Sequence, residues 1–155
     1  MSTIDKVRDY LRSVGMEDRL IVTDQSSATV ELAAKAVGTE PGRIAKSLTF
    51  LTEGKPVMIL AAGDARVDNR KFKDRFHTKA KMIPWDLVED YVGHEPGGVC
   101  PFALKEGVSV YLDVSLKQYD TVYPAGGSPN SAVRLSPEEL ERISGSLGWV
   151  DVCRA

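Results

Sequence analysis

Residues 44–62 read IAKSLTFLTEGKPVMILAA and constrain the fold more than any other stretch of the chain. Residues 44–51 have the length and the apolar, β-favouring composition of a strand, and residues 56–62 repeat that composition. The intervening Glu53-Gly54-Lys55 predicts a tight hairpin turn. Two adjacent strands that are apolar at most positions are typical of the middle of a sheet that is covered on both sides.

Lys46 lies within the first of these strands. Because side chains alternate between the two faces of a strand, Lys46 shares a face with Ile44, Leu48 and Phe50. A buried ammonium is costly unless it is paired, and burial lowers the pKa of a lysine, which is one way that lysines become useful in functional sites. The alternative is a lysine at the sheet edge, whose stem packs while its ammonium reaches water.

A loop rich in glycine and proline spans residues 93–102, which read GHEPGGVCPF. Glycine lets the main chain approach a ligand closely and proline fixes the direction of the chain, so backbone N–H and C=O groups become available for binding. We name it the glycine loop and expect it to face Lys46. An ordinary tight surface turn is the alternative. Residues 126–130, GGSPN, form a second glycine loop.

Periodicity and capping residues place the remaining elements. The predicted helices cover residues 4–14, 30–37 and 84–92, and the predicted strands cover residues 20–22, 108–113, 121–123, 132–135 and 149–152. Together with the hairpin, these elements predict one α+β domain over residues 1–155, with a mixed sheet flanked by helices.

A capping box marks the start of the last helix. Ser136-Pro137-Glu138-Glu139 combines a cap, a proline at the first helical position and a capping-box glutamate. We expect Leu140, Ile143 and Leu147 to pack this helix against the core and Gly148 to end it.

Composition excludes several classes of protein. The chain is 43% hydrophobic and 27% charged with a net charge of −2, which is ordinary for a globular protein and gives no overall nucleic-acid signal. No stretch approaches the roughly 18 apolar residues of a membrane span, and the N-terminus lacks the pattern of a signal peptide, so we expect a cytoplasmic protein with reduced cysteines. The two cysteines and two histidines lack zinc spacing, and neither GxxxxGK[ST] nor GxGxxG occurs, so we expect no metal and no cofactor.

Positive charge is concentrated between residues 66 and 81. This segment has seven basic residues against two acidic ones, so it carries a net +5 and leaves −7 on the rest of the chain. Asp68 can cap a helix here, with Phe72 and Phe76 on one side and basic residues as far as Lys81 on the other. Such a patch suits a partner that has a few phosphates; a solvated helix face is the alternative.

Few side chains are placed for catalysis. Cys100 and His94 could form a nucleophile pair, but a cysteine between valine and proline is more often packed. Glu95 and Asp113 could do acid–base work, but nothing pairs them, and an aspartate at a strand end is more often a turn former or cap. What remains is a loop with available backbone groups, a semi-buried lysine and a basic helix.

At these residues the chain resembles the YbaK/EbsC family, the freestanding relatives of the editing domain that is inserted in bacterial prolyl-tRNA synthetases. The matching segments, in order, are residues 29–34 (TVELAA), residues 43–48 (RIAKSL), Gly98-x-x-Pro101-Phe102, residues 110–113 (VYLD) and residues 132–135 (AVRL). The resemblance implies an α+β fold with a mixed, partly barrel-like sheet. It also implies trans-editing in translation: a metal-independent deacylase that hydrolyses the ester bond of mischarged aminoacyl-tRNA, with mischarged tRNA(Pro) as the expected substrate.

The resemblance also implies roles for individual residues. Lys46 matches the essential lysine of the family, and Gly98 and Pro101 match its glycine-loop motif; they position the substrate and the attacking water or substrate group, without an enzyme nucleophile. We assign substrate binding to Thr29, Ser47, Gly97, Val99, Cys100, Phe102, Asp113 and Ser128. We assign contacts with tRNA phosphates to Arg70, Lys71, Lys73, Lys79 and Lys81. The expected partners are the tRNA acceptor end and prolyl-tRNA synthetase.

The edited amino acid stays open. Subfamilies remove alanine, cysteine, serine or other residues; here Ser47 follows the lysine where alanine-editing relatives tend to have asparagine, and no residue matches the pocket tyrosine of the cysteine-specific type. Two other functions also stay open. One is a tRNA- or synthetase-binding module of the same fold with little catalysis, and the other is a hydrolase of another small ester or thioester.

Overall fold

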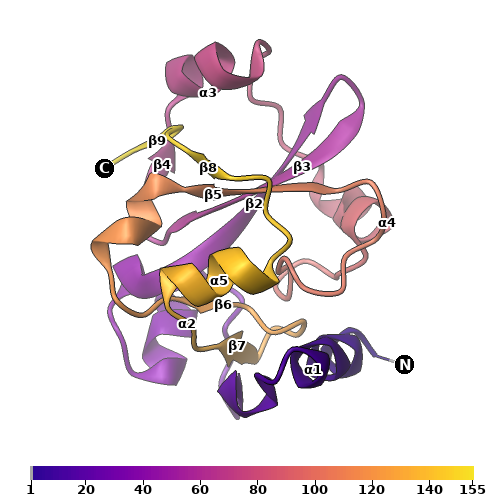
Figure 1. Cartoon of the computed structure of the whole chain (residues 1–155), viewed down its shortest axis with the longest axis vertical. Helices are drawn as coiled ribbons and strands as arrows, with labels where there is room; N and C mark the ends of the chain where they lie inside the picture. The colour runs from indigo at the N-terminus through magenta and orange to yellow at the C-terminus, as the bar shows by residue number, and fades with distance from the viewer. Residues whose placement is uncertain (1) are drawn as a thin grey trace.

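The computed structural model describes residues 2–155, and Figure 1 shows helices packed around a mixed β-sheet. The helices are α1 (Thr3–Ser13), α2 (Val30–Val37), α3 (Asn69–Phe76), α4 (Val88–Val92) and α5 (Pro137–Ile143). The strands are β1 (Leu20–Val22), β2 (Ile44–Thr52), β3 (Lys55–Ala62), β4 (Arg66–Val67), β5 (Ser109–Asp113), β6 (Tyr123–Pro124), β7 (Ser131–Val133), β8 (Trp149–Val150) and β9 (Cys153–Arg154). Within residues 2–155, no helix has the length and apolar character that a membrane crossing requires.

The β2–β3 hairpin lies at the centre of the sheet, as residues 44–62 predict. The strand order is β6-β2-β3-β5-β8; β2 and β3 are antiparallel and the other neighbouring pairs are parallel. Glu53 and Gly54 turn the chain with φ of 52° and 78°, the left-handed conformations that a two-residue hairpin turn requires. β3 is buried from Val57 to Ala62, as expected of a strand that is covered on both faces.

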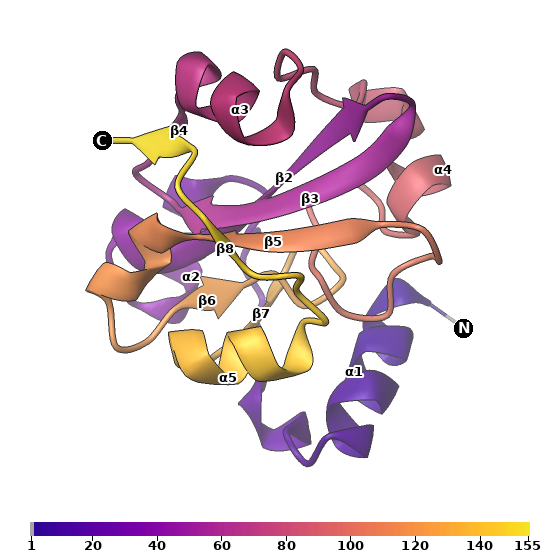
Figure 2. The same ribbon diagram turned by 45° about the horizontal axis from the view of Figure 1, so that its top comes forward.

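Helices cover both sides of this hairpin. Figure 2 shows α3 on one side and α1 and α5 on the other. On the α3 side, the ring of Phe72 packs against those of Phe50 and Phe76, with ring centroids 4.9 and 4.8 Å apart. On the α1 side, Val7 and Leu11 lie one helical turn apart and are completely buried. The predicted α+β fold with a mixed sheet is confirmed.

Two short sheets extend the central one. β7 pairs with β1, and a bridge between Ala125 and Ala132 joins β7 to the chain that follows β6. The pairing therefore continues beyond β6 to β7 and β1. β4 pairs with β9 on the side of α3.

The basic helix is shorter than the sequence predicts. α3 ends at Phe76, because His77 adopts the left-handed conformation with φ of 63° and its N–H donates to the carbonyl of Lys73. Asp68 caps the helix as predicted. Lys79 and Lys81 therefore lie beyond the helix, on the segment that leads to α4.

The last helix begins as predicted but ends early. The Ser136 hydroxyl accepts the N–H of Glu139 at 3.1 Å, and the Glu139 carboxylate accepts the N–H of Ser136 at 2.9 Å, so the capping box is confirmed. The prediction that Leu147 packs this helix is wrong. α5 ends at Ile143, and the N–H of Leu147 donates instead to the carbonyl of Val110 on β5 at 2.8 Å, which leaves the leucine side chain 66% exposed.

Candidate functional site

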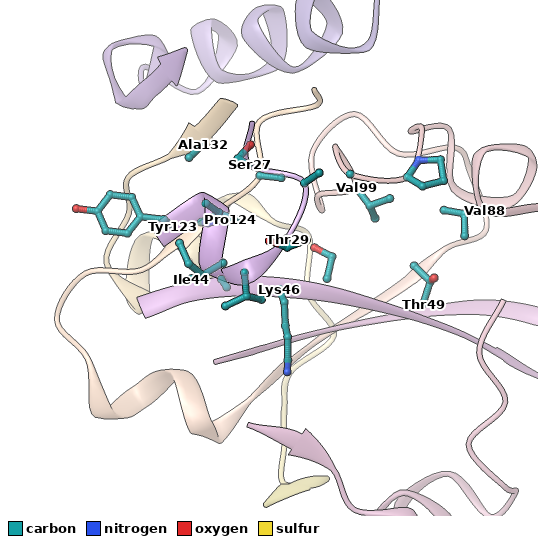
Figure 3. A pocket seen from close by; sticks show the side chains of 18 of the residues that line it. Ser27, Thr29, Ile44, Lys46, Thr49, Val88, Val99, Tyr123, Pro124 and Ala132 are labelled. Carbon is teal, nitrogen blue, oxygen red and sulfur yellow. The ribbon is translucent and has the colours of Figure 1, made fainter. Parts of the chain in front are cut away.

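A cavity of about 400 Å³ lies between β2 and the glycine loop. Its wall is assembled from segments that are far apart in the sequence, as Figure 3 shows. These segments fall within residues 27–33, 44–49, 82–88, 96–99 and 123–132. Most of the lining side chains are apolar, and a volume of this order with a few polar groups is typical of a site for a small molecule or for one end of a larger one. Of the predicted site residues, those that line it are Thr29, Lys46, Ser47, Gly97 and Val99.

One face of β2 supplies two of the polar groups of the cavity wall. Ser47 and Thr49 line the cavity two residues apart, as the alternation of a strand requires. The Ser47 Oγ atom is buried and has no hydrogen-bond partner among residues 2–155, and Thr49 is 5% exposed. Thr29, at the start of α2, uses its hydroxyl to accept the N–H of Leu32 at 3.2 Å. The helix cap is therefore part of the cavity wall.

Lys46 borders the cavity, but its ammonium points away from Val99 of the glycine loop (Figure 3). The ammonium donates hydrogen bonds to the carbonyl oxygens of Gly63, at 3.3 Å, and Ala65. Burial lowers the pKa of Lys46 below its usual value, in the direction that the sequence predicts. The expectation that Lys46 faces the glycine loop is wrong, because the alternation along β2 turns Ser47 to the cavity and Lys46 to the turn after β3.

The glycine loop has two separate roles. The loop residues that line the cavity are Pro96, Gly97 and Val99. Gly98 packs instead against the second glycine loop, where an added Cβ would lie 2.7 Å from main-chain atoms of both Gly127 and Ser128. Such a close approach leaves no space for a side chain at this position. The two glycine loops can therefore contact each other here only because residue 98 is glycine.

The remaining loop residues with predicted roles lie behind the cavity wall. Cys100 and Phe102 are completely buried, and the Cys100 Sγ atom lies 3.6 Å from Nε2 of His94. That nitrogen lies 2.6 Å from the carbonyl oxygen of Phe102, to which it donates, so it cannot also take the proton of the thiol. Burial raises the pKa of Cys100 to about 12 and lowers that of His94. These contacts support the packed interpretation of Cys100. Pro101 is also buried and does not line the cavity.

Asp113 and Ser128 also lie outside the cavity wall. The Asp113 carboxylate accepts the N–H groups of Ser115 at 3.0 Å and Val152 at 2.9 Å, so it forms a turn and fixes the C-terminal segment beside β5. The interpretation of Asp113 as a turn former or cap is confirmed. Ser128 donates to Asn130 Oδ1 at 2.7 Å and also contacts the Ser131 hydroxyl, inside the second glycine loop.

The predicted phosphate-binding residues fall into two groups. The first group lies on α3, which Figure 1 shows at the opposite end of the molecule from α1 and α2, and consists of Arg70, Lys71 and Lys73. The Lys71 ammonium is already held by the Asp151 carboxylate at 3.1 Å and the Cys153 carbonyl at 3.0 Å. The second group, Lys79 and Lys81, is exposed and immediately precedes the cavity wall.

Two exposed residues of the cavity wall were given no role in the site from the sequence. Met82 is 56% exposed and Trp85 is 73% exposed, and both line the cavity. The available signal was the run Met82-Ile83-Pro84-Trp85 directly after the basic cluster, of which Pro84 and Trp85 were interpreted only as the start of the helix predicted over residues 84–92. Tyr123 and Pro124 of β6 also line the cavity.

Comparisons with other proteins agree with this architecture. Residues 24–143 match the sequence profile of the aminoacyl-tRNA editing domain. The chain is 48% identical over 153 residues to the uncharacterized protein YwhH of Bacillus subtilis, with 98% of each chain covered. It is 33% identical over 95 residues to the proline–tRNA ligase of Limosilactobacillus fermentum, which covers 57% of this chain and 17% of that enzyme. A crystal structure described as a candidate trans-editing enzyme for prolyl-tRNA synthetase superimposes with a TM-score of 0.88 at 29% identity and covers 100% of this chain and 99% of the other. The chain therefore belongs to the aminoacyl-tRNA editing domain family.

Proposed function

We propose that this protein is an aminoacyl-tRNA deacylase that acts in trans and hydrolyses the ester bond of mischarged tRNA, with mischarged tRNA(Pro) as its substrate. The observation that carries the proposal is the cavity of about 400 Å³ between β2 and the glycine loop, in a chain of the editing-domain family. The cavity suits an aminoacyl group and the ribose to which it is esterified, while the rest of the tRNA stays outside.

The lining residues favour a mechanism without an enzyme nucleophile. Among residues 2–155, those that line the cavity include no aspartate, glutamate, histidine or cysteine. No carboxylate, imidazole or thiolate is therefore available as a base or nucleophile, and the Lys46 ammonium is engaged by the carbonyls of Gly63 and Ala65, so the attacking group is a water molecule or a hydroxyl or amine of the substrate itself. Within residues 2–155, no group of three or more histidine, cysteine or acidic side chains is placed to hold a metal ion.

Main-chain groups of the glycine loop are suited to stabilise the developing negative charge. Pro96 has no N–H, and the N–H of Gly98 already donates to the carbonyl of Glu95 at 3.1 Å. The donors that the loop can offer to the substrate are therefore those of Gly97 and Val99, the other two loop residues in the cavity wall. Preorganised N–H groups of this kind need little rearrangement during the reaction.

Lys46 enters the proposal as a residue that positions substrate and terminal-adenosine groups by charge and hydrogen bonding. Its ammonium binds the carbonyls of Gly63 and Ala65, so contact with the substrate requires a change of rotamer toward the cavity that Lys46 borders. Such a move is favoured when a phosphate or carbonyl oxygen replaces the two acceptors that the ammonium leaves.

The test is deacylation of Ala-, Cys- and Ser-tRNA(Pro) by the wild type, by Lys46→Ala and by the control Lys55→Ala, which removes an exposed lysine at the hairpin. We expect rapid loss of one aminoacyl group, abolished by Lys46→Ala and unaffected by Lys55→Ala. If no charge is lost at high enzyme concentration while tRNA still binds, the binding-module alternative replaces the proposal. If a small ester is cleaved at a rate that does not depend on salt, the substrate is not tRNA.

A further inference from the structure

Trp85 and Met82 form an exposed apolar step at the mouth of the cavity, with 73% and 56% of their surfaces exposed. We propose that this step is the platform on which the 3′-terminal adenine of tRNA stacks, with Lys79 and Lys81 holding the phosphates that precede it. The inference rests on the proposed function, since it places the nucleotide that carries the ester next to the cavity that receives the aminoacyl group.

The exposure of Trp85 sets it apart from the other tryptophan of the chain. Trp149 is partly buried against the core, and the Lys117 ammonium lies 4.5 Å from the centre of its ring. Trp85 presents a large flat ring to solvent at the edge of a concave site, where aromatic residues commonly anchor ligands. Bases stack on such rings whatever their sequence, because every base has a π-face.

The main chain around this step is fixed before any ligand arrives. The N–H of Leu51 donates to the carbonyl of Lys81 at 2.8 Å, and the N–H of Ile83 donates to the carbonyl of Thr49 at 3.0 Å. Residues 81–83 thus pair with β2, and Met82 forms a bridge opposite Phe50. Met82 is thus held beside β2 by main-chain hydrogen bonds, and Trp85 begins the short 3-10 helix Trp85–Leu87 that follows, so neither residue of the step lies on a free loop.

Charge gives the bound strand a direction. Lys79 and Lys81 are exposed, and no ion pair within the described part of the chain engages either of them. The acidic residues of this region, Asp86, Glu89 and Asp90, come after Trp85 and are also exposed. A phosphate backbone is therefore expected to approach over the lysines and to end with its last base on Trp85.

A nucleic-acid end fits this step better than a protein does, because the apolar step consists of two residues and is preceded by Lys79 and Lys81, which make no ion pair within residues 2–155. Loss of one base–aromatic stack weakens binding by between about fivefold and about 150-fold. Because the platform holds the substrate equally before and during the reaction, Trp85→Ala should raise KM by that factor and leave kcat unchanged.

The test measures binding and catalysis separately. In a Trp149→Phe background Trp85 is the only tryptophan, so its fluorescence reports stacking directly. An acceptor-stem RNA hairpin that ends in CCA should quench this emission, and the same RNA without the terminal adenosine should not. Trp85→Ala should raise KM for the mischarged tRNA by the factor given above, Trp85→Phe should restore most of the affinity, and Leu87→Ala, at a neighbouring residue that does not line the cavity, should leave KM unchanged.

The outcomes separate this inference from the proposed function. Deacylation with a normal KM in Trp85→Ala and no difference between the two RNAs would overturn the platform and leave the deacylase intact. Adenosine-dependent quenching without any deacylation would support the platform while the proposed function fails. A dimer that dissociates on Trp85→Ala, measured by light scattering, would assign the exposed step to a second copy of the chain and overturn the inference.

Discussion

Gly98→Ala tests whether the two glycine loops are joined as the structure shows. The new Cβ would lie 2.7 Å from Gly127 C and from Ser128 N, and 2.9 Å from the Gly127 carbonyl oxygen. Optimal contacts of carbon atoms are about 3.5–4.0 Å, so the loops must separate by roughly 1 Å, and overpacking of this kind costs about 1–3 kcal/mol. For a domain of this size, the expected fall in melting temperature is about 2–12 °C.

The sign of the effect makes this test sharp. The φ of Gly98 does not lie in the left-handed region, so an alanine there is conformationally allowed. If the loops did not touch, Gly98→Ala would stabilise the protein by about 0.4–1 kcal/mol through the unfolded state. A urea midpoint equal to or above that of the wild type would therefore refute the reasoning. Gly97→Ala is the matched control: its φ is 94° and the nearest atom to its Cβ would be 3.4 Å away, so it measures backbone strain without the clash.

Two further predictions concern groups with displaced pKa values. Glu139→Gln should lower the free energy of unfolding by about 2 kcal/mol at pH 7, because Arg19 and the Ser136 N–H both donate to this carboxylate. These contacts lower the pKa of Glu139 from 4.5 to about 2, so the stability is present above pH 4.5 and is lost as the pH falls toward 2. Urea unfolding of the wild type and the variant should converge over that range, with the exposed Glu138→Gln as control. Burial raises the pKa of the Cys100 thiol to about 12, so native protein should not react with iodoacetamide at pH 8, and Cys100→Ala should keep the proposed deacylase activity; a folded but inactive variant would instead favour a nucleophilic cysteine.

Local sequence signals were sufficient for most of the fold. The hairpin of residues 44–62 follows from two apolar runs and one turn, and the caps at Asp68 and Ser136 follow from short side chains that pair with the first helical N–H groups. Both signals act within a few residues. The ends of α3 and α5 depend instead on hydrogen bonds to distant strands or on single backbone conformations, which periodicity does not contain.

The residues that line the cavity were harder to predict from the sequence than the fold. The direction of Lys46 depends on carbonyl groups at Gly63 and Ala65, which only the fold brings to the far face of β2. Gly98 could be identified as a special glycine, but its partner in the second glycine loop could not. The sequence shows that residue 85 is a tryptophan, but its exposure at the cavity mouth depends on how residues 81–83 pair with β2.

The scattered origin of the cavity wall has a consequence for synthesis of the protein on the ribosome. The Ser27 hydroxyl donates to the carbonyl of Ser131, which lies 104 residues later in the sequence. The segments that line the cavity are spread over a similar length of sequence. Contacts of such long range form slowly and late, since the loop that they close must first be ordered. When β2 and the glycine loop have emerged from the ribosome but residues 123–132 have not, one wall of the cavity is still missing. Binding of an aminoacyl end should therefore begin abruptly when that last segment emerges, and a translation-arrested series of chain lengths would show it as a step.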